Sequence, residues 1–392
     1  MLTTLACTLM AAGATAQVLD VNIGSVTYRY NAGDCGQMTY GDNGTTLTIG
    51  QKTYTLSEVT DIKTAPTGSM DSTVNVVYSA AAASVTIPGH LAPYVTAAVS
   101  GAHVSIAQSS DVSDDTCGEI TYNLSGASDD GEFYLSGSYK ATVEMDGLTL
   151  TNTSRTYSGA PIYIDNGKRI DLSVKKGTEN TIKDTAASTE KGCLYCKGHL
   201  ELKGQGTLNI YAYGTAAHGI KTGDYCEMRK CTVNILSAAK DGLHANAYFL
   251  QESGALTISG VGDDGIQVEL DGTTNTGETN DHDGEDSANI YIADGTLTVT
   301  TTAVGAKCLK SDNAVNLRGG TIDCTAKGGV DTSNSSDLSG SCAIKAETAL
   351  NISGGTVTAK ATGQGGKAIS SDGTITISGG TVSASSTGSN YG

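Results

Sequence analysis

A short apolar sequence motif, called here the word, recurs along the second half of this 392-residue chain. This repeat limits the possible folds more than any other feature. The apolar positions of this word are Leu194, Ile220, Leu243, Ile266, Leu309, Ile344 and Ile369. A turn and a second apolar strand, often Gly-Gly-Thr-Val, follow each word, with apolar positions at Leu208, Val233, Leu256, Leu297, Ile322, Val357 and Val382. A unit of about 23–26 residues, with insertions near 270–288 and 328–340, predicts a repeat architecture.

The composition of each unit indicates strands rather than helices. No unit contains a helix-length stretch with a 3.6-residue period, and the asparagine-and-leucine signature of leucine-rich repeats is absent. Short apolar strands separated by Gly, Asn, Asp and Ser are typical of one coil of a parallel β-solenoid. All four prolines precede residue 162, as expected for stacked strands that are paired on both sides. We therefore predict an all-β fold, a right-handed parallel β-helix, over residues 118–392.

The two ends of the chain differ from the repeats. Residues 1–16 are predicted to be a signal peptide, because a short apolar stretch leads to the small-residue triplet Ala14-Thr15-Ala16; a buried strand or a lipoprotein site at Cys7 are the alternatives. Residues 17–117 lack the period and predict a small irregular or sandwich-like β region. The last repeat reaches Gly392 without a polar capping unit. This predicts a β-helix that is incomplete at its C-terminus and self-associates end to end or is covered by a partner.

The charge of the chain is strongly negative and unevenly distributed. The formal net charge is −17, which excludes the basic surface that nucleic-acid binding needs. No apolar run is long enough for a transmembrane helix. Eleven carboxylates and no Lys or Arg fall within residues 241–286. The acidity therefore belongs mainly to two repeats and one insertion.

Aligning the repeats brings part of this acidity into one column. His218, Asp241, Asp264 and Lys307 all stand two residues before the apolar position, so Asp241 and Asp264 should lie one strand apart, at about 5 Å. Carboxylates at this distance repel unless a cation or a proton lies between them, and Ca²⁺ takes six to eight oxygen ligands. The predicted calcium ligands are Asp241, Asp263 and Asp264, joined by Asp281 and Asp283 of the insertion. Solvated acidic turns are the alternative, because Asp-Gly is common turn chemistry.

A second column follows the apolar position by one residue. Its members are Lys221, His244, Gln267, Lys310 and Lys345. We predict Lys221, His244 and Tyr225 as carbohydrate-binding residues, since tyrosine rings stack on sugars. Further candidates for stacking are Tyr195, Tyr211 and Tyr213. Under the alternative interpretation the histidines are ordinary polar residues, the tyrosines are half-buried strand residues, and Lys307 forms a salt bridge with Asp264.

Two sequence motifs resemble a known family. The run Gly-Val-Gly-Asp-Asp-Gly-Ile-Gln at 260–267 and the words Ile-Ser-Gly-Gly-Thr-Val at 352–357 and 377–382 resemble secreted bacterial carbohydrate-binding β-helix proteins, common in gut Bacteroidetes-type and cellulolytic bacteria. The resemblance covers roughly residues 118–392. It implies a polysaccharide-lyase-like fold, bound calcium, cellulose-like or pectic polysaccharide partners, and a secreted, periplasmic or cell-surface location in a bacterium.

Family 9-type pectate lyases provide a second resemblance. In that family calcium sits on aspartates of successive coils and a lysine abstracts a proton from the sugar. Asp241, Asp263 and Asp264 match the carboxylates, and Lys307 or Lys310 matches the lysine, although the insertion before Lys307 departs from the family pattern. The lyase comparison thus implies one of these two lysines as the catalytic base.

Three functions stay open from the sequence. Non-catalytic, calcium-stabilised polysaccharide binding is favoured, with no catalytic residue assigned. A calcium-dependent polysaccharide lyase is the second, with the metal neutralising the uronate carboxylate. A surface or adhesin-like scaffold without a small ligand is the third.

Overall fold

The computed structural model describes residues 17–31, 35–66, 72–270, 288–334 and 338–390. The predicted signal peptide and the predicted ligands Asp281 and Asp283 lie outside these residues. Among the described residues, helix is limited to two three-residue 3-10 helices, η1 (Asp42–Gly44) and η2 (Gly89–Leu91). No helix in that part of the chain is long and apolar enough to cross a membrane. The predicted all-β class is confirmed, with large parallel sheets.

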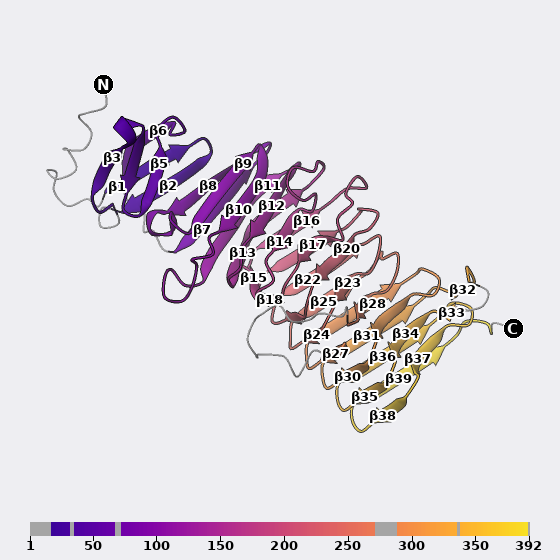
Figure 1. Ribbon diagram of the computed structural model, residues 1–392. Coiled ribbons are helices and arrows are strands. Elements are labelled where there is room, and N and C mark those ends of the chain that lie inside the picture. Colours follow the sequence, from indigo (N-terminus) through magenta and orange to yellow (C-terminus); the bar gives the residue numbers. More distant parts are fainter. Residues whose placement is uncertain (1–16, 32–34, 67–71, 271–287, 335–337, 391–392) are drawn as a thin grey trace.

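Strands of successive repeats lie side by side along an elongated molecule, in sequence order (Figure 1). Eleven strands form one sheet, called here the first sheet. Its strands are β9 (Val95–Ser100), β10 (Ala102–Gln108), β12 (Gly131–Ser136), β14 (Ile162–Asp165), β17 (Gly192–Cys196), β20 (His218–Thr222), β23 (Leu243–Ala245), β26 (Ile266–Val268), β29 (Lys307–Ser311), β34 (Cys342–Ala346) and β37 (Lys367–Ser371). All pairings from β10 onward are parallel.

Two further columns of parallel strands are joined through β13, which pairs with β15 and with β16. The second column contains β11 (Ile120–Ser128), β13 (Ala141–Thr151), β15 (Ile170–Val174), β18 (Leu200–Gly204), β21 (Cys226–Met228), β24 (Tyr248–Gln251), β27 (Asn289–Ile292), β30 (Ala314–Leu317), β35 (Ala349–Ile352) and β38 (Thr374–Ile377). The third contains β16 (Glu179–Lys183), β19 (Thr207–Tyr211), β22 (Thr232–Ser237), β25 (Ala255–Ile258), β28 (Thr296–Thr301), β31 (Thr321–Ala326), β36 (Thr356–Ala361) and β39 (Thr381–Ser386). Each repeat thus contributes one strand to each column.

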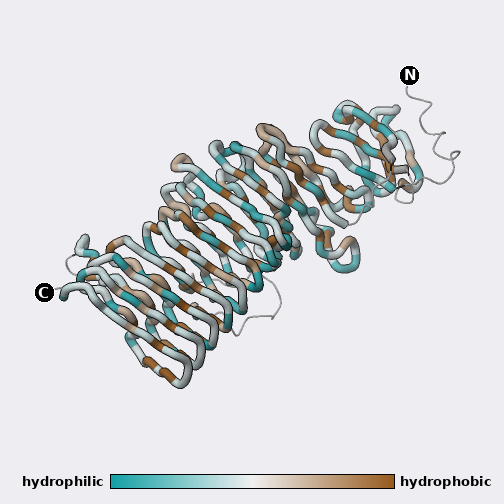
Figure 2. The backbone as a smooth tube through the Cα atoms, turned by 180° about the vertical axis from the view of Figure 1, so that it is seen from behind, coloured by the Kyte–Doolittle hydropathy of each residue, from teal (hydrophilic) through white to brown (hydrophobic). Residues whose placement is uncertain are grey.

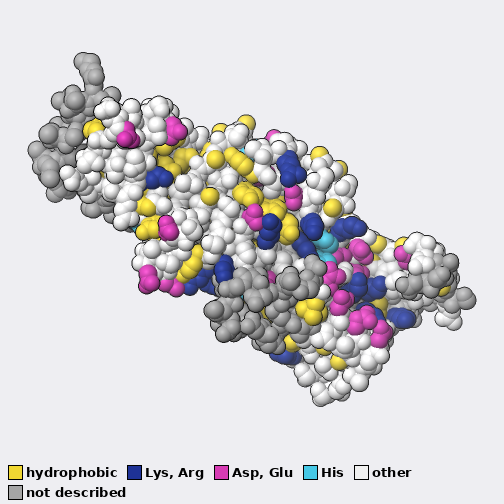
Figure 3. Space-filling model, in the orientation of Figure 1, with side chains coloured by type: hydrophobic (Ala, Val, Ile, Leu, Met, Phe, Trp, Pro, Cys, Tyr) yellow, Lys and Arg dark blue, Asp and Glu magenta, His cyan; other side chains and the backbone are white. Residues whose placement is uncertain are grey.

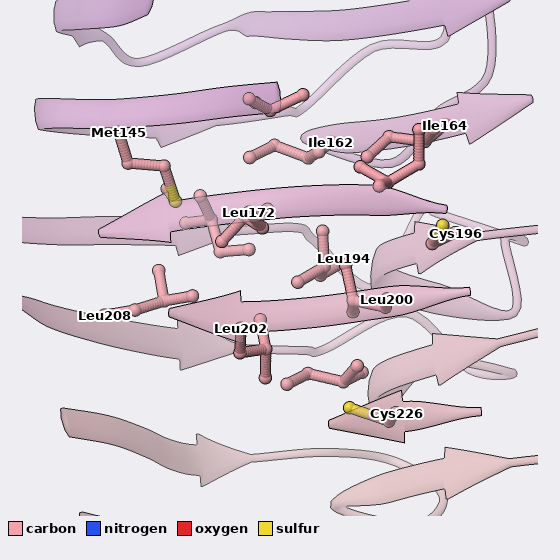
Figure 4. Packing of buried hydrophobic residues seen from close by; sticks show 14 of the residues in the cluster. Met145, Ile162, Ile164, Leu172, Leu194, Cys196, Leu200, Leu202, Leu208 and Cys226 are labelled. Atoms are coloured by element: carbon pink, nitrogen blue, oxygen red, sulfur yellow. The ribbon is translucent and has the colours of Figure 1, made fainter. Parts of the chain in front are cut away.

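The predicted apolar positions lie in two continuous rows. In the first sheet Leu194 pairs with Ile220, which pairs with Leu243, and the row continues to Ile369. In the third column the row runs from Leu208 to Val382. Side chains of all three columns meet in one core, and bands of hydropathy recur along the backbone (Figures 2 and 4). Burial of these rows, at roughly 25 cal/mol per Å², is the main stabilising contribution.

The repeat pattern did not predict the strands of the second column. From β15 onward its strands are short, as in β21 (Cys226–Met228), and they carry no Gly-Gly-Thr motif. Their inward residues still alternate with outward ones, as in Leu200 and Leu202 of β18, which are both buried. Without a fixed motif, strands this short do not stand out from the turns beside them.

The N-terminal part is mainly antiparallel. Its strands are β1 (Gln17–Ile23), β2 (Val26–Asn31), β3 (Met38–Gly41), β4 (Thr46–Ile49), β5 (Lys52–Thr55), β6 (Asp61–Pro66), β7 (Thr73–Ser79) and β8 (Ala82–Pro88). β1 pairs with β2 and β6, and β3, β4 and β5 form a meander. Parallel pairing of β7 with β11 and of β10 with β12 joins this region to the repeats. A short antiparallel pair, β32 (Val330–Asp331) and β33 (Ser339–Gly340), lies within the predicted second insertion.

Three glycines allow the first sheet to approach the third column closely. A Cβ atom on Gly219 would lie 2.5 Å from Ile235 Cγ2, and one on Gly242 would lie 2.4 Å from Ile258 Cγ2. A Cβ atom on Gly265 would lie 2.3 Å from a methyl group of β28, the strand that follows β25 in the third column. Real Cβ atoms do not approach so closely, so the glycine of each Asp-Gly or His-Gly word is required by packing.

Candidate functional site

One row of side chains runs along the outer surface of the first sheet, between residues that are buried in the core. The row, called here the outward row, contains Tyr134, Tyr163, Tyr195, Lys221, His244, Gln267, Lys310 and Lys345, each paired in register with the next. Figure 3 shows histidine, basic and acidic side chains together over β20 and β23, next to a more apolar area over β14 and β17. The outward row therefore has an aromatic half and a polar half.

The aromatic half consists of three half-buried tyrosines in contact, of which Tyr134 and Tyr163 are stacked and Tyr163 and Tyr195 meet edge to face. The ring centroids of Tyr134 and Tyr163 are 5.5 Å apart, and those of Tyr163 and Tyr195 are 4.9 Å apart. The Tyr134 hydroxyl donates to Asp165 Oδ2 at 2.7 Å, and Lys197 Nζ lies 2.7 Å from the other oxygen of that carboxylate. The rings are thus fixed by neighbouring strands, with charged groups beside them.

The predicted column of His218, Asp241, Asp264 and Lys307 is present in the structure. The Asp241 N–H donates to His218 Nδ1 at 3.2 Å, the Asp264 N–H donates to Asp241 Oδ1 at 3.0 Å, and the Lys307 N–H donates to Asp264 Oδ1 at 2.6 Å. Each side chain therefore binds the backbone of the following repeat. Both aspartates are 2% exposed, so these bonds form away from water.

Two histidines converge on the second oxygen of Asp241. His218 Nδ1 lies 3.2 Å and His244 Nδ1 lies 2.8 Å from Asp241 Oδ2, while His244 Nε2 lies 2.9 Å from Glu269 Oε1. Burial raises the pKa of Asp241, but the two imidazoles outweigh it and hold the pKa below its usual range. Burial also lowers the pKa of His218, which favours its neutral form.

Lys310, and not Lys307, forms the ion pair with Asp264. Lys310 Nζ lies 3.3 Å from Asp264 Oδ2, whereas Lys307 Nζ donates to Ser339 Oγ at 2.7 Å. The expected salt bridge of Lys307 is therefore wrong, because its side chain turns toward the β32–β33 insertion. Burial raises the pKa of Asp264 to about 6, an effect that Lys310 opposes and the charges of Asp241 and Asp263 reinforce.

Lys310, one of the two lysines considered as lyase bases, is not prepared for that role by its surroundings. A general base must be unprotonated near neutral pH. Burial lowers the pKa of Lys310, but the Asp264 carboxylate outweighs it, and the net shift is upward. The side chain of Lys307 instead donates to the Ser339 hydroxyl. The contact with Asp264 therefore favours a charged, binding role for Lys310.

Two groups of side chains bring possible metal-ligating atoms within 4.8 Å of one another. One is Asp241, Asp263 and Asp264, three of the predicted calcium ligands. The other is His218, Asp241 and His244. Of these, Asp241 was a predicted calcium ligand, His244 a predicted sugar contact, and both histidines ordinary polar residues under the alternative interpretation. The repeat alignment gave the columns of these residues but not the side-chain rotamers that turn both Nδ1 atoms toward one oxygen.

The predicted carbohydrate-binding residues separate into two places. Lys221 and His244 lie in the outward row and are 8% and 7% exposed, and Lys221 Nζ donates to Asn246 Oδ1. Tyr225 lies elsewhere, 1% exposed, between His199 and Tyr248 at centroid distances of 4.5 and 4.8 Å. Its ring has no exposed face for a sugar. Tyr134 and Tyr163 were missed because the repeats before residue 190 are degenerate, although both follow an apolar residue as Tyr195 does.

We expect two neighbouring carboxylates of the second column, Glu201 and Asp171, to make the stability of the protein depend on pH. Burial and the adjacent Asp171 raise the pKa of Glu201 from 4.5 to about 7. A raised acid pKa contributes stability that is complete below pH 4.5 and lost as the pH rises through 7. We expect Glu201→Gln to match the wild type at pH 4 and to be more stable by about 1–2 kcal/mol at pH 8, after allowance for solvent screening.

Urea unfolding at the two pH values measures this difference. Glu179→Gln, on the exposed side of β16, is the matched amide control. An equal effect of Glu201→Gln at both pH values would contradict the raised pKa of Glu201.

Comparison with known proteins identifies the family. The family model described as "Carbohydrate-binding domain-containing protein" matches residues 100–390. No curated protein matches the sequence significantly. A solved polysaccharide lyase-like protein from C. thermocellum, a gadolinium derivative, is similar at 18% identity and a TM-score of 0.47, over 79% of this chain and 97% of the other. Because the family model spans most of the sequence, the chain belongs to the carbohydrate-binding domain-containing proteins.

Proposed function

We propose that this protein is a non-catalytic, extracytoplasmic polysaccharide-binding protein whose glycan lies along the outward row. The observation that carries this proposal is the unbroken register of the row, from three adjoining tyrosines to Lys221, His244, Gln267 and Lys310. A repeating array of aromatic rings and hydrogen-bonding groups suits a repeating polymer. Family membership supports the ligand class.

The two halves of the row would contribute differently to binding. Tyrosine presents an apolar ring and a polar hydroxyl, and both sugar C–H groups and sugar hydroxyls find partners there. Lysine, glutamine and histidine offer donors and acceptors to hydroxyls or to uronate carboxylates. Cellulose-like and pectic glycans are both compatible with this chemistry. The acidic groups beside Lys310 would require a bridging cation or screening before a polyanion could bind.

We also propose that the three columns wind as a right-handed parallel β-helix. The support is that each repeat supplies one strand to every column in the same order, and parallel crossovers are right-handed in nearly all proteins. The predicted signal peptide supports the extracytoplasmic location.

Calcium is proposed to bind the cluster of Asp241, Asp263 and Asp264. Three carboxylates whose oxygens lie within 4.8 Å of one another suit an oxygen-ligated cation. The raised pKa of Asp264 supports the proposal, since a cation there would offset burial and like-charge repulsion. Asp263 is exposed and would provide access from solvent.

Calcium should therefore raise the thermal midpoint of the wild-type protein. A ligand that binds only the folded state stabilises it by about 2.7 kcal/mol at 100 times its Kd. We expect Asp264→Asn to lose most of this increment, and the exposed control Asp294→Asn to keep it. Thermal unfolding in EDTA and in millimolar Ca²⁺ measures the increment. An unchanged wild-type midpoint would reject the calcium site.

Affinity gel electrophoresis tests the proposed function. Native gels containing soluble β-glucan or polygalacturonate, each with Ca²⁺ and with EDTA, should retard the wild-type protein on at least one polymer. Absence of retardation on all four gels, by a folded protein, would contradict the proposal. Appearance of an unsaturated product from polygalacturonate would favour the lyase alternative instead.

A further inference from the structure

Three side-chain atoms that could bind a metal ion converge beside β20 and β23: His218 Nδ1, His244 Nδ1 and Asp241 Oδ2. His244 Nε2 faces the Glu269 carboxylate, and His244 Nδ1 faces the Asp241 carboxylate, so a neutral imidazole satisfies only one of the two contacts. His218 Nδ1 accepts the Asp241 N–H and also lies 3.2 Å from Asp241 Oδ2. The Nδ1 atoms of both histidines therefore lie within 3.2 Å of the same carboxylate oxygen.

A cation bound between these three atoms would be a partner for the carboxylate and for both ring nitrogens. The oxygen–nitrogen separations of 3.2 and 2.8 Å are near the ligand–ligand separation of about 3.3 Å that tetrahedral Zn²⁺ requires. Glu269 stands behind His244 as the carboxylates behind zinc-ligating histidines do, accepting from the ring nitrogen that does not face the metal. Such a partner fixes the tautomer with a free Nδ1 lone pair.

We propose that His218, Asp241 and His244 bind a divalent transition-metal ion of the Zn²⁺ type, with Glu269 as the orienting partner of His244. Two imidazoles and one carboxylate are a donor set that such ions prefer to Ca²⁺. The side chains of His218, His244 and Asp241 are 15%, 8% and 3% exposed, so His218 gives the ion its route to solvent. The fourth position would be open to water or to a glycan hydroxyl.

This site is different in chemistry from the proposed calcium cluster, although Asp241 belongs to both. The histidines face Oδ2 of Asp241, and its Oδ1 accepts the Asp264 N–H. Asp263 belongs only to the carboxylate cluster, and His218 only to the histidine group. Substitutions at these two positions therefore separate the two metals.

Isothermal titration of the metal-free 392-residue chain with ZnCl₂ tests the proposal. We expect saturable 1:1 binding that millimolar Ca²⁺ does not abolish. His218→Ala should weaken Zn²⁺ binding at least about 100-fold, and Glu269→Gln, which removes only the orienting carboxylate, about 10-fold. Asp263→Asn and the surface control His90→Ala should bind Zn²⁺ as the wild type does.

Cobalt substitution gives a readout that needs no variant. Co²⁺ in the wild-type protein should show the visible ligand-field bands of a four-coordinate site, and ZnCl₂ should remove them. Absence of saturable Zn²⁺ binding, or equal binding by folded His218→Ala, would overturn the proposal. Imidazole NMR signals showing two protonated rings and no response to Zn²⁺ would also overturn it, because protons would then occupy the contacts.

Discussion

Gly242→Val is expected to destabilise the protein by about 3 kcal/mol or more, and to displace Asp241 and Leu243 on either side of it. The Cβ of residue 242 would lie 2.4 Å from Ile258 Cγ2 and 2.6 Å from the Gly265 carbonyl oxygen. Neither neighbour can withdraw freely, because Ile258 is fully buried and that carbonyl accepts the Leu243 N–H at 2.9 Å. The strand β23 must therefore move outward, away from β25.

Chemical unfolding followed by circular dichroism measures this loss. Gly329→Ala is the matched control, because its added Cβ would meet only ordinary contacts, the nearest being Gln364 O at 3.6 Å. Gly242→Val with wild-type stability would show that the first sheet and the third column are not packed as closely as described.

Tyr163→Ala is expected to weaken polysaccharide binding by at least about tenfold, or about 1.4 kcal/mol. Tyr163 stands between Tyr134 and Tyr195, so its loss removes one ring and the support of two others. Tyr213→Ala is the control, because Tyr213 is 44% exposed outside the row. Calorimetry with the polymer that retards the wild type gives both affinities. Equal affinities of Tyr163→Ala and the wild type would remove the aromatic half of the row from the site.

The repeat pattern predicted much of the fold because one apolar position per strand is enough to define a register. Leu194, Ile220 and Leu243 lie in register as the spacings predict, and so do Leu208 and Val233. The second column was not predicted, since its strands have no fixed sequence motif. Long intervals, such as that between Ile266 and Leu309, still ended in register.

The repeat alignment predicted which residues of the candidate site share a column, but not which side chains contact one another. The alignment placed Asp241 and Asp264 one repeat apart, and the Asp264 N–H does donate to Asp241 Oδ1. Whether Lys307 or Lys310 reaches Asp264 depends on which face of β29 each side chain occupies and on the turn toward Ser339. Such choices depend on rotamers and on neighbouring insertions, about which the spacing of residues contains no information.

Hydroxyl-radical footprinting of the tyrosines, read by mass spectrometry, tests the location of the glycan most directly. The wild-type protein is labelled alone, with soluble β-glucan, and with polygalacturonate in Ca²⁺. We predict that at least one polymer protects Tyr134, Tyr163 and Tyr195 while Tyr40 and Tyr213, which are 53% and 44% exposed, keep their labelling. Binding of a polymer without protection of the three row tyrosines would contradict the assignment of the outward row as the polysaccharide site.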